Sequence, residues 1–269
     1  MKDIDAFLKK LHYFDKKFKL FINQNNDHLI VEYPELCGII DEYSSFIINH
    51  DNEKQWNNLD QSIEILPLVE NLRSNSSVCI QIMEKYRALV LSHENEEITD
   101  YFRNIEDCIE KEFGGFQITS QSKVLLVGSG PFPITLLMIA ERTGAEVFGI
   151  DIDNEAVQLG KHVVNKLGSQ LSIQIDNKSV RELPVIKQIT HIIFSSTVSC
   201  KYDILDQLYD LTNKDVLIAM RYGNGLKSLF NYPMQQVDET KWQIIENIIH
   251  PQSVFDVILY RKDNDRRRL

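Results

Sequence analysis

The sequence has few cysteines, no long apolar run and a deficit of basic charge. Cys37, Cys79, Cys108 and Cys200 lie far apart with no CxxC pair, which argues against a zinc knuckle or a thioredoxin-type motif. The apolar stretch 132–140 is far shorter than the ~20 residues that a membrane-spanning helix needs. The N-terminus lacks the continuous apolar core of a secretion signal. We therefore expect a soluble cytoplasmic protein with reduced cysteines.

The charge balance argues against two classes of partner. The 269 residues contain 29 Lys and Arg against 39 Asp and Glu, a net charge of -10. Nucleic-acid backbones and anionic membranes both favour basic surfaces, so we expect neither as a partner. A hydrophobic fraction of 43% is enough for a sizeable core, and the length favours about two domains of roughly 150 residues. A small-molecule partner is the better starting hypothesis.

The first 113 residues are predicted to be helical, because apolar residues recur at helical spacing and glycines are scarce. Phe7, Leu8, Leu11 and Phe14 form one apolar face of an opening helix. Further amphipathic helices are predicted over 63–72 and 78–91. A turn is expected at 72–77, with Ser76 or Ser77 as N-cap of the second helix. The polar segment 50–62 is expected to be a solvated connection with little regular structure.

After Gly114-Gly115 strands and helices alternate, which is typical of a parallel sheet. Strands are expected at 124–130, 145–153, 171–176, 191–196 and 216–221, with helices ending near Arg142, over 155–167 and over 204–211. The last two strands, in WQIIENIIHP and Val254–Lys262, leave no room for a helix between them and should pair antiparallel. This ending favours an α/β fold of the Rossmann-like, class I methyltransferase type. We expect an all-α N-terminal domain, 1–116, and the Rossmann-like domain, 117–269.

A glycine turn follows the first of these strands. Gly128, Ser129, Gly130 and Pro131 lie between a predicted strand and a predicted helix, where the backbone can approach a ligand. The loop GSGPFP departs from the dinucleotide pattern GxGxxG because Pro133 replaces the last glycine. Proline is tolerated in the first turn of a helix. A strand, a turn and a helix are therefore still expected here, but the sequence gives less support for a ligand that contains a pyrophosphate.

Polar residues end the following strands, and in an open parallel sheet such ends converge on one crevice. Asp151 and Asp153 come about 20 residues after the glycines, where a carboxylate can accept hydrogen bonds from an adenosine ribose. A helix cap is an equally good role for Asp153. Further candidates are Asp176 and Asn177 for an adenine edge, and Ser195, Ser196 and Thr197, for which ordinary turn chemistry is the stronger alternative.

Four parts of the chain carry a family resemblance: VLLVGSGPFPITLLMIA (Val124–Ala140), GIDID, AMRYGNG with LFNYP, and VILYRK near the end. In these motifs the sequence resembles the nicotianamine synthases and their bacterial relatives that make opine metallophores. It implies an S-adenosylmethionine enzyme that transfers the 3-amino-3-carboxypropyl arm to an amine and releases 5′-methylthioadenosine. Within the family, the bacterial D-histidine 2-aminobutanoyltransferases of staphylopine-type pathways are most similar in length and composition.

The resemblance also implies roles for residues outside the cofactor loop. Glu84 would hold and help to deprotonate the acceptor amine, with Tyr101 as its orienting partner, and Arg221 would hold a carboxylate of the transferred arm or of the acceptor. The alternatives are a solvated helix-face acid for Glu84 and an ordinary surface arginine for Arg221. S-adenosylmethionine is the expected co-substrate and no metal is expected. D-histidine is the expected acceptor, a homodimer is compatible with the resemblance, and a downstream opine dehydrogenase would receive the product.

The sequence alone leaves three other functions open. A conventional S-adenosylmethionine methyltransferase would keep the same sheet and loops but would be indifferent to Glu84. A nicotinamide dehydrogenase would need the fingerprint that Pro133 interrupts. A non-catalytic adenosine-binding module would bind the nucleoside without consuming it.

Overall fold

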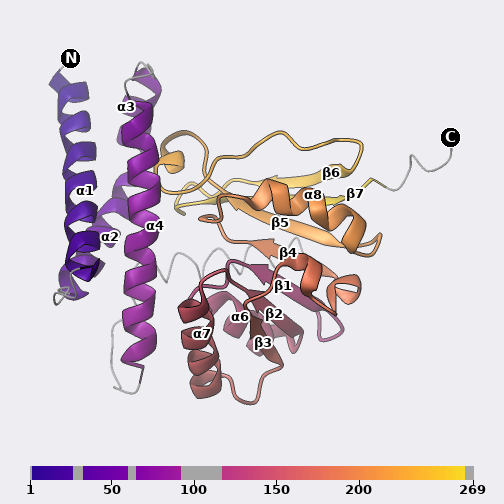
Figure 1. Ribbon diagram of the computed structural model, residues 1–269. Coiled ribbons are helices and arrows are strands. Elements are labelled where there is room, and N and C mark those ends of the chain that lie inside the picture. Colours follow the sequence, from indigo (N-terminus) through magenta and orange to yellow (C-terminus); the bar gives the residue numbers. More distant parts are fainter. Residues whose placement is uncertain (1, 27–32, 60–64, 92–116, 264–269) are drawn as a thin grey trace.

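The computed structural model describes residues 2–26, 33–59, 65–91 and 117–263. Its first part is helical, with α1 (Lys2–Asn26), α2 (Tyr33–Ile47), α3 (His50–Asn58) and α4 (Leu66–Leu89). Figure 1 shows these helices on one side of the sheet, with α4 nearest to it. The predicted apolar face of the opening helix is confirmed, since Phe7, Leu11 and Phe14 are buried and α1 packs on α4.

The prediction of an irregular connection over 50–62 is wrong, because residues 50–58 form α3. Its start is fixed by Asn49, whose side-chain oxygen accepts hydrogen bonds from the backbone N–H groups of Asp51 (2.9 Å) and Asn52 (3.0 Å). Its one large apolar residue, Trp56, is buried. A good N-cap and one anchoring aromatic therefore suffice for a helix in a strongly polar segment.

The prediction of a turn at 72–77 is also wrong, because α4 runs through it without a break, so that neither Ser76 nor Ser77 is an N-cap. Leu72 and Ser76 are fully buried within the helix, and Arg73 donates from Nε to the Ser228 carbonyl at 2.7 Å. Serine and asparagine are common in turns, but the segment contains no glycine or proline that would force the helix to end. Tertiary packing therefore overrides the local preference.

The second part is a seven-stranded sheet, and the predicted parallel core with an antiparallel closing pair is confirmed. The strand order is β3-β2-β1-β4-β5-β7-β6. The strands are β1 (Lys123–Val127), β2 (Glu146–Ile150), β3 (Ile173–Asp176), β4 (His191–Phe194), β5 (Leu217–Tyr222), β6 (Trp242–Ile248) and β7 (Asp256–Lys262). Strands β1 to β5 pair in parallel, whereas β7 pairs antiparallel with both β5 and β6.

Helices cover both faces of the sheet, and the strand residues alternate between them. Val124 and Leu126 of β1 pack with α6 (Ile134–Thr143), α7 (Asn154–Leu167) and the N-terminal helices. Leu125 and Val127 face the other way, toward α8 (Lys201–Leu211) and the short helices η1 (Val180–Glu182) and η2 (Ile186–Gln188). A third short helix, η3 (Gly225–Leu229), contacts α3 and α4.

The expected boundary between residues 116 and 117 adjoins 92–116, which lie outside the described residues, and it stays a prediction. The first of the two hydrophobic clusters contains residues of α1, α2 and α4 as well as strand residues such as Val124 and Ile193. The helical part and the sheet therefore share a core. No described helix is long and apolar enough to cross a membrane.

Candidate active site

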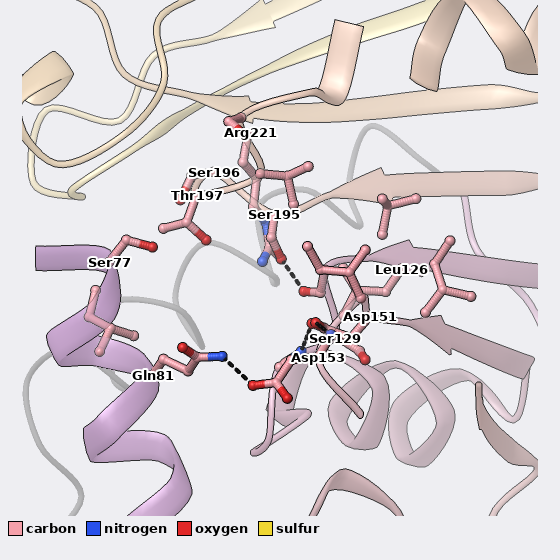
Figure 2. A pocket seen from close by; sticks show the side chains of 18 of the residues that line it. Ser77, Gln81, Leu126, Ser129, Asp151, Asp153, Ser195, Ser196, Thr197 and Arg221 are labelled. Atoms are coloured by element: carbon pink, nitrogen blue, oxygen red, sulfur yellow. Dashed lines mark hydrogen bonds between the residues drawn. The ribbon is translucent and has the colours of Figure 1, made fainter. Parts of the chain in front are cut away.

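A pocket of about 490 Å³ lies at the carboxyl ends of the strands, where α4 covers the sheet. The strand order reverses between β1 and β4, since β2 lies on one side of β1 and β4 on the other. Such a switch point leaves a crevice at the strand ends and is the usual ligand site of open α/β sheets. Residues from the ends of β1, β2, β4 and β5 and from one face of α4 line it (Figure 2).

The predicted glycine turn forms the floor of this pocket. Gly128 and Gly130 have φ angles of 82° and 67°, which side-chain-bearing residues rarely adopt. A Cβ at Gly128 would lie 2.5 Å from a methyl carbon of Val198, and one at Gly130 would lie 2.8 Å from Oε2 of Glu84. The buried Ser129 hydroxyl has no hydrogen-bond partner in the described part of the chain. The two glycines therefore let the Val198 and Glu84 side chains pack directly against the turn.

Asp151 and Asp153 hold this floor and connect it to α4. Asp151 accepts from the backbone N–H of Gly130 (2.9 Å) through Oδ2 and from that of Asp153 (3.0 Å) through Oδ1. Asp153 caps α7, since its Oδ1 accepts from Glu155 N–H at 2.9 Å. The capping alternative for Asp153 is confirmed.

The second carboxylate oxygen of Asp153 binds the helical part of the chain. Its Oδ2 accepts from Gln81 Nε2 at 2.7 Å and lies 2.9 Å from Lys85 Nζ. Lys85 also pairs with Glu155 at 2.6 Å. Figure 2 shows the Gln81 side chain reaching from α4 to Asp153. These contacts fix α4 against the start of α7.

Glu84 lies where α4 faces the glycine turn. Burial of its carboxyl raises the pKa of Glu84 to about 8, the neighbouring Asp151 carboxylate acts in the same direction, and the Arg87 guanidinium opposes both. Glu84 is half-buried and lines the pocket, so it does not lie on the solvated outer face of the helix. A carboxyl with a pKa in this range can exchange a proton with an amine near neutral pH.

Arg221 is only 4% exposed and lines the same pocket. Its Nη1 donates to the Thr135 hydroxyl at 3.3 Å, and its guanidinium lies over the Phe255 ring at 5.1 Å. These contacts hold a cation at the end of β5, which rules out the alternative of an ordinary surface arginine. A buried guanidinium is well suited to bind a carboxylate.

The end of β4 supplies two further predicted residues, Ser196 and Thr197, to the lining. The neighbouring Ser195 donates from its hydroxyl to the Gly128 carbonyl at 2.7 Å. Ser195 thus ties the end of β4 to the glycine turn, which is a supporting role within the site.

Two predicted candidates stay outside the lining, and one lies outside the described residues. The Asp176 carboxylate lies 3.6 Å from Lys178 Nζ, and the Asn177 amide donates to the Asp151 carbonyl at 2.7 Å. Neither side chain is brought into the pocket. Tyr101 belongs to the segment 92–116 that the structure leaves undescribed.

Sequence reasoning named Glu84 of α4 but missed Ser77 and Gln81 on the same helix, and it missed Ile152. Ser77, Gln81 and Glu84 lie at positions i, i+4 and i+7 of one helix and all line the pocket. The wrongly predicted turn at 72–77 separated Ser77 from the helix that contains Gln81 and Glu84, although the helical period places all three on one face. Ile152 is 96% exposed although it is apolar, and it lines the pocket beside the two aspartates.

The pocket therefore combines an acid with a pKa near 8, a buried guanidinium, a glycine floor and an exposed apolar side chain. An acid and a cation in one pocket can bind the amine and the carboxylate of amino-acid groups. The apolar side chain next to carboxylates suits a nucleoside, whose base is flat and whose ribose carries hydroxyls. In the described part of the chain, no three His, Cys, Asp or Glu side chains gather as metal ligands do.

Comparison with known proteins gives a consistent picture. The sequence profile described as nicotianamine synthase protein matches residues 48–266. The L-histidine 2-aminobutanoyltransferase of Pseudomonas aeruginosa strain UCBPP-PA14 is 27% identical over 243 residues, which cover 87% of this chain and 91% of that protein. The protein of the same name from Yersinia pestis is 31% identical over 204 residues, which cover 75% of each chain.

Solved structures share the fold over nearly the whole chain. MtNAS in complex with MTA and tNA has a TM-score of 0.78 at 12% identity, and the match covers 96% of this chain and 98% of that chain. A mutant of MtNAS in complex with S-adenosylmethionine has a TM-score of 0.74 at 11% identity, with coverages of 94% and 97%. The likeness therefore includes the N-terminal helices as well as the sheet.

Proposed function

Because the chain belongs to the nicotianamine synthase family, we propose that it transfers the 3-amino-3-carboxypropyl (aminobutanoyl) group of S-adenosylmethionine to the α-amine of an amino acid. The second product is 5′-methylthioadenosine. The observation that carries the proposal is the presence of Glu84 and Arg221 in one pocket above the glycine turn. The names of the curated relatives support the same transfer.

The pocket fits S-adenosylmethionine as co-substrate. We assign the cofactor contacts to eight lining residues, namely Gly128, Ser129, Gly130, Pro131, Asp151, Asp153, Ser196 and Thr197. The two oxygens of Asp151 each accept one backbone hydrogen bond, and a carboxylate oxygen has room for a second. Asp151 can therefore also accept from ribose hydroxyls. Ile152 offers an apolar contact for the base.

Positioning decides which bond breaks, since all three carbons on the sulfonium are electrophilic. The amine nitrogen attacks the arm carbon that is bonded to sulfur. The new C–N bond forms as the C–S bond breaks. The electron pair of the broken C–S bond stays on sulfur. The leaving thioether is neutral and needs no general acid.

The amine must lose a proton, and Glu84 is the group that we assign to this task. An amino-acid amine is protonated at pH 7, and the carboxyl of Glu84 has a pKa of about 8, close enough to that of the amine for efficient proton transfer. Tyr101 is proposed as its orienting partner on the basis of the family resemblance. Arg221 binds a carboxylate, either of the transferred arm or of the acceptor.

We propose that histidine is the acceptor and that it receives one aminobutanoyl group. The reaction would be a step of nicotianamine-like, staphylopine-type metallophore biosynthesis. The resemblance favours D-histidine, whereas the curated relatives carry L-histidine in their names. Both enantiomers carry the α-amine and the carboxylate that we assign to Glu84 and Arg221. The product would pass to an opine dehydrogenase, and the enzyme could act as a homodimer.

The test is mass spectrometry of the purified protein incubated with S-adenosylmethionine and either D-histidine, L-histidine or no acceptor. We expect 5′-methylthioadenosine and an aminobutanoyl-histidine adduct in the D-histidine reaction. The same products in the L-histidine reaction alone would support the proposed transfer, with L-histidine instead of D-histidine as the acceptor. S-adenosylhomocysteine would establish a methyltransferase instead.

A matched pair of variants on α4 assigns the role of the acid. Glu84→Gln keeps the shape of the side chain but cannot take a proton, so the rate of adduct formation should fall by about 100-fold or more. Glu70→Gln makes the same chemical change at an exposed position of the same helix and should leave the rate unchanged. Full activity of Glu84→Gln would remove the proposed proton-transfer role.

A further inference from the structure

Lys201, the first residue of α8, is a lysine with no exposed surface. Its ammonium donates to two backbone carbonyls, that of Arg221 at 2.7 Å and that of Ser196 at 3.0 Å. Burying an ammonium group costs free energy unless strong partners compensate. An apolar side chain of similar length would fill the same space without that cost. The lysine therefore calls for an explanation beyond packing.

The surroundings of Lys201 disfavour its charge. Burial lowers the pKa of Lys201 to about 7, and the positive charge of Arg73 on α4 acts in the same direction. The ammonium is thus held mainly by the dipoles of the two carbonyls.

The two carbonyls belong to strand ends that separate to form the pocket. The parallel ladder between β4 and β5 ends with the pair Phe194 and Met220. Beyond that pair, Ser196 and Arg221 both line the pocket. Lys201 connects them just where the backbone ladder stops. The Ser196 carbonyl also accepts from the N–H of Tyr232 at 3.2 Å, and on its other side β5 pairs with β7 at Arg221 and Tyr222. Lys201 is thus the link between the two strand ends on the side that faces β4.

We propose that Lys201 is a positioning residue that holds the Arg221 guanidinium in place for its carboxylate by fixing the end of β5 to the loop after β4. The inference rests on the proposed function, because it needs Arg221 to bind a carboxylate. Lys201 is not itself among the residues that line the pocket, so it acts through Arg221. The carboxylate comes from S-adenosylmethionine or from the acceptor amino acid.

The test measures, by calorimetry, the affinities of three ligands for the full-length protein and its variants. S-adenosylmethionine and histidine carry a carboxylate, whereas 5′-methylthioadenosine does not. Arg221→Gln should weaken one of the two carboxylate ligands by about tenfold or more. Lys201→Met should weaken the same ligand by about tenfold and leave the affinity for 5′-methylthioadenosine within about twofold. The double variant should be no weaker than Arg221→Gln alone, because both changes remove one interaction.

Two further variants separate positioning from folding. Lys201→Gln keeps N–H donors on a shorter, uncharged side chain and should show a smaller loss than Lys201→Met. Lys166→Met removes an exposed lysine of α7 and should change no affinity. Equal weakening of all three ligands in Lys201→Met would mean a merely structural lysine and would overturn the inference.

The outcomes distinguish this inference from the assignment on which it rests. If Arg221→Gln weakens neither carboxylate ligand, the proposed role of Arg221 fails. If Arg221→Gln weakens one of them but Lys201→Met leaves that ligand unaffected, the Arg221 assignment stands and the role of Lys201 fails.

Discussion

At the scale of single residues, Glu84 makes a stability contribution that depends on pH. Its pKa is about 8 in the folded chain, against an ordinary value of 4.5, because its carboxyl is buried and Asp151 lies nearby. Between these values the folded state retains a proton that the unfolded state releases, so this contribution falls as pH rises from about 4.5 to about 8. Glu84→Gln removes it. Urea unfolding at several pH values measures the difference in free energy of unfolding between the variant and the parent. This difference should shift in favour of the variant as pH rises from about 4.5 to about 8 and should stay constant at higher pH.

The glycine turn offers a second prediction at this scale. Gly130→Ala should weaken S-adenosylmethionine binding, because the added Cβ would lie 2.8 Å from Glu84 Oε2 and must displace the Glu84 side chain within the pocket. Gly144→Ala is the matched control, since Gly144 has a similar φ of 71° but its Cβ would meet only the Cβ of Ser120 at 3.5 Å. Both variants should lose about 1 kcal/mol of stability to backbone strain. Unimpaired binding by Gly130→Ala would show that the turn does not approach the ligand.

Local sequence patterns predicted the glycine turn and the strand ends but not the partial burial of Glu84 or the burial of Arg221. The turn follows from glycines between a strand and a helix. Glu84 is half-buried against a turn more than 40 residues away, and Arg221 is buried against Thr135 and Phe255, which are distant from it in the chain. Such contacts leave no trace in the residues next to either side chain, so only the family resemblance pointed to them.

At the scale of secondary-structure elements, Asp153 joins two helices. It caps α7 through Glu155 N–H and binds Gln81 and Lys85 of α4. Asp153→Ala loses all of these contacts and should destabilise the fold by about 1 to 2 kcal/mol. Asp153→Asn keeps an oxygen for the cap but loses the ion pair, so its loss should be smaller. Urea unfolding of both variants measures the difference, and equal stability of Asp153→Ala and the parent would contradict this account.

Strands and helices were not equally easy to predict. The strands were located because apolar, β-branched runs ended by glycine or polar residues have few other interpretations. Helix α3 and the middle of α4 were not predicted, because α3 is rich in asparagine and segment 72–77 of α4 in serine, and both residue types also favour turns. In both cases packing decided, through the buried Trp56 of α3 and the buried Leu72 of α4. Tertiary contacts of this kind cannot be read from composition.

At the scale of the whole molecule, the shared core predicts cooperative unfolding. The chain has two tryptophans, of which Trp56 belongs to the helical part and Trp242 to β6. Trp242→Phe and Trp56→Phe therefore each leave one fluorescent reporter, in different parts. Because one hydrophobic cluster spans both parts, fluorescence and circular dichroism should give the same urea midpoint within each variant. If fluorescence changed at a lower urea concentration than circular dichroism in either variant, the part of the chain that holds the remaining tryptophan would unfold separately.

The central claim, that the enzyme breaks the bond between sulfur and the aminobutanoyl arm, is tested most directly by isotope labelling. The protein is incubated with histidine and S-adenosylmethionine that carries ¹³C either in the methyl group or in the carboxyl group of the arm. The account predicts the carboxyl label in the histidine adduct and the methyl label in 5′-methylthioadenosine. A methyl label on histidine, with the carboxyl label in S-adenosylhomocysteine, would contradict it.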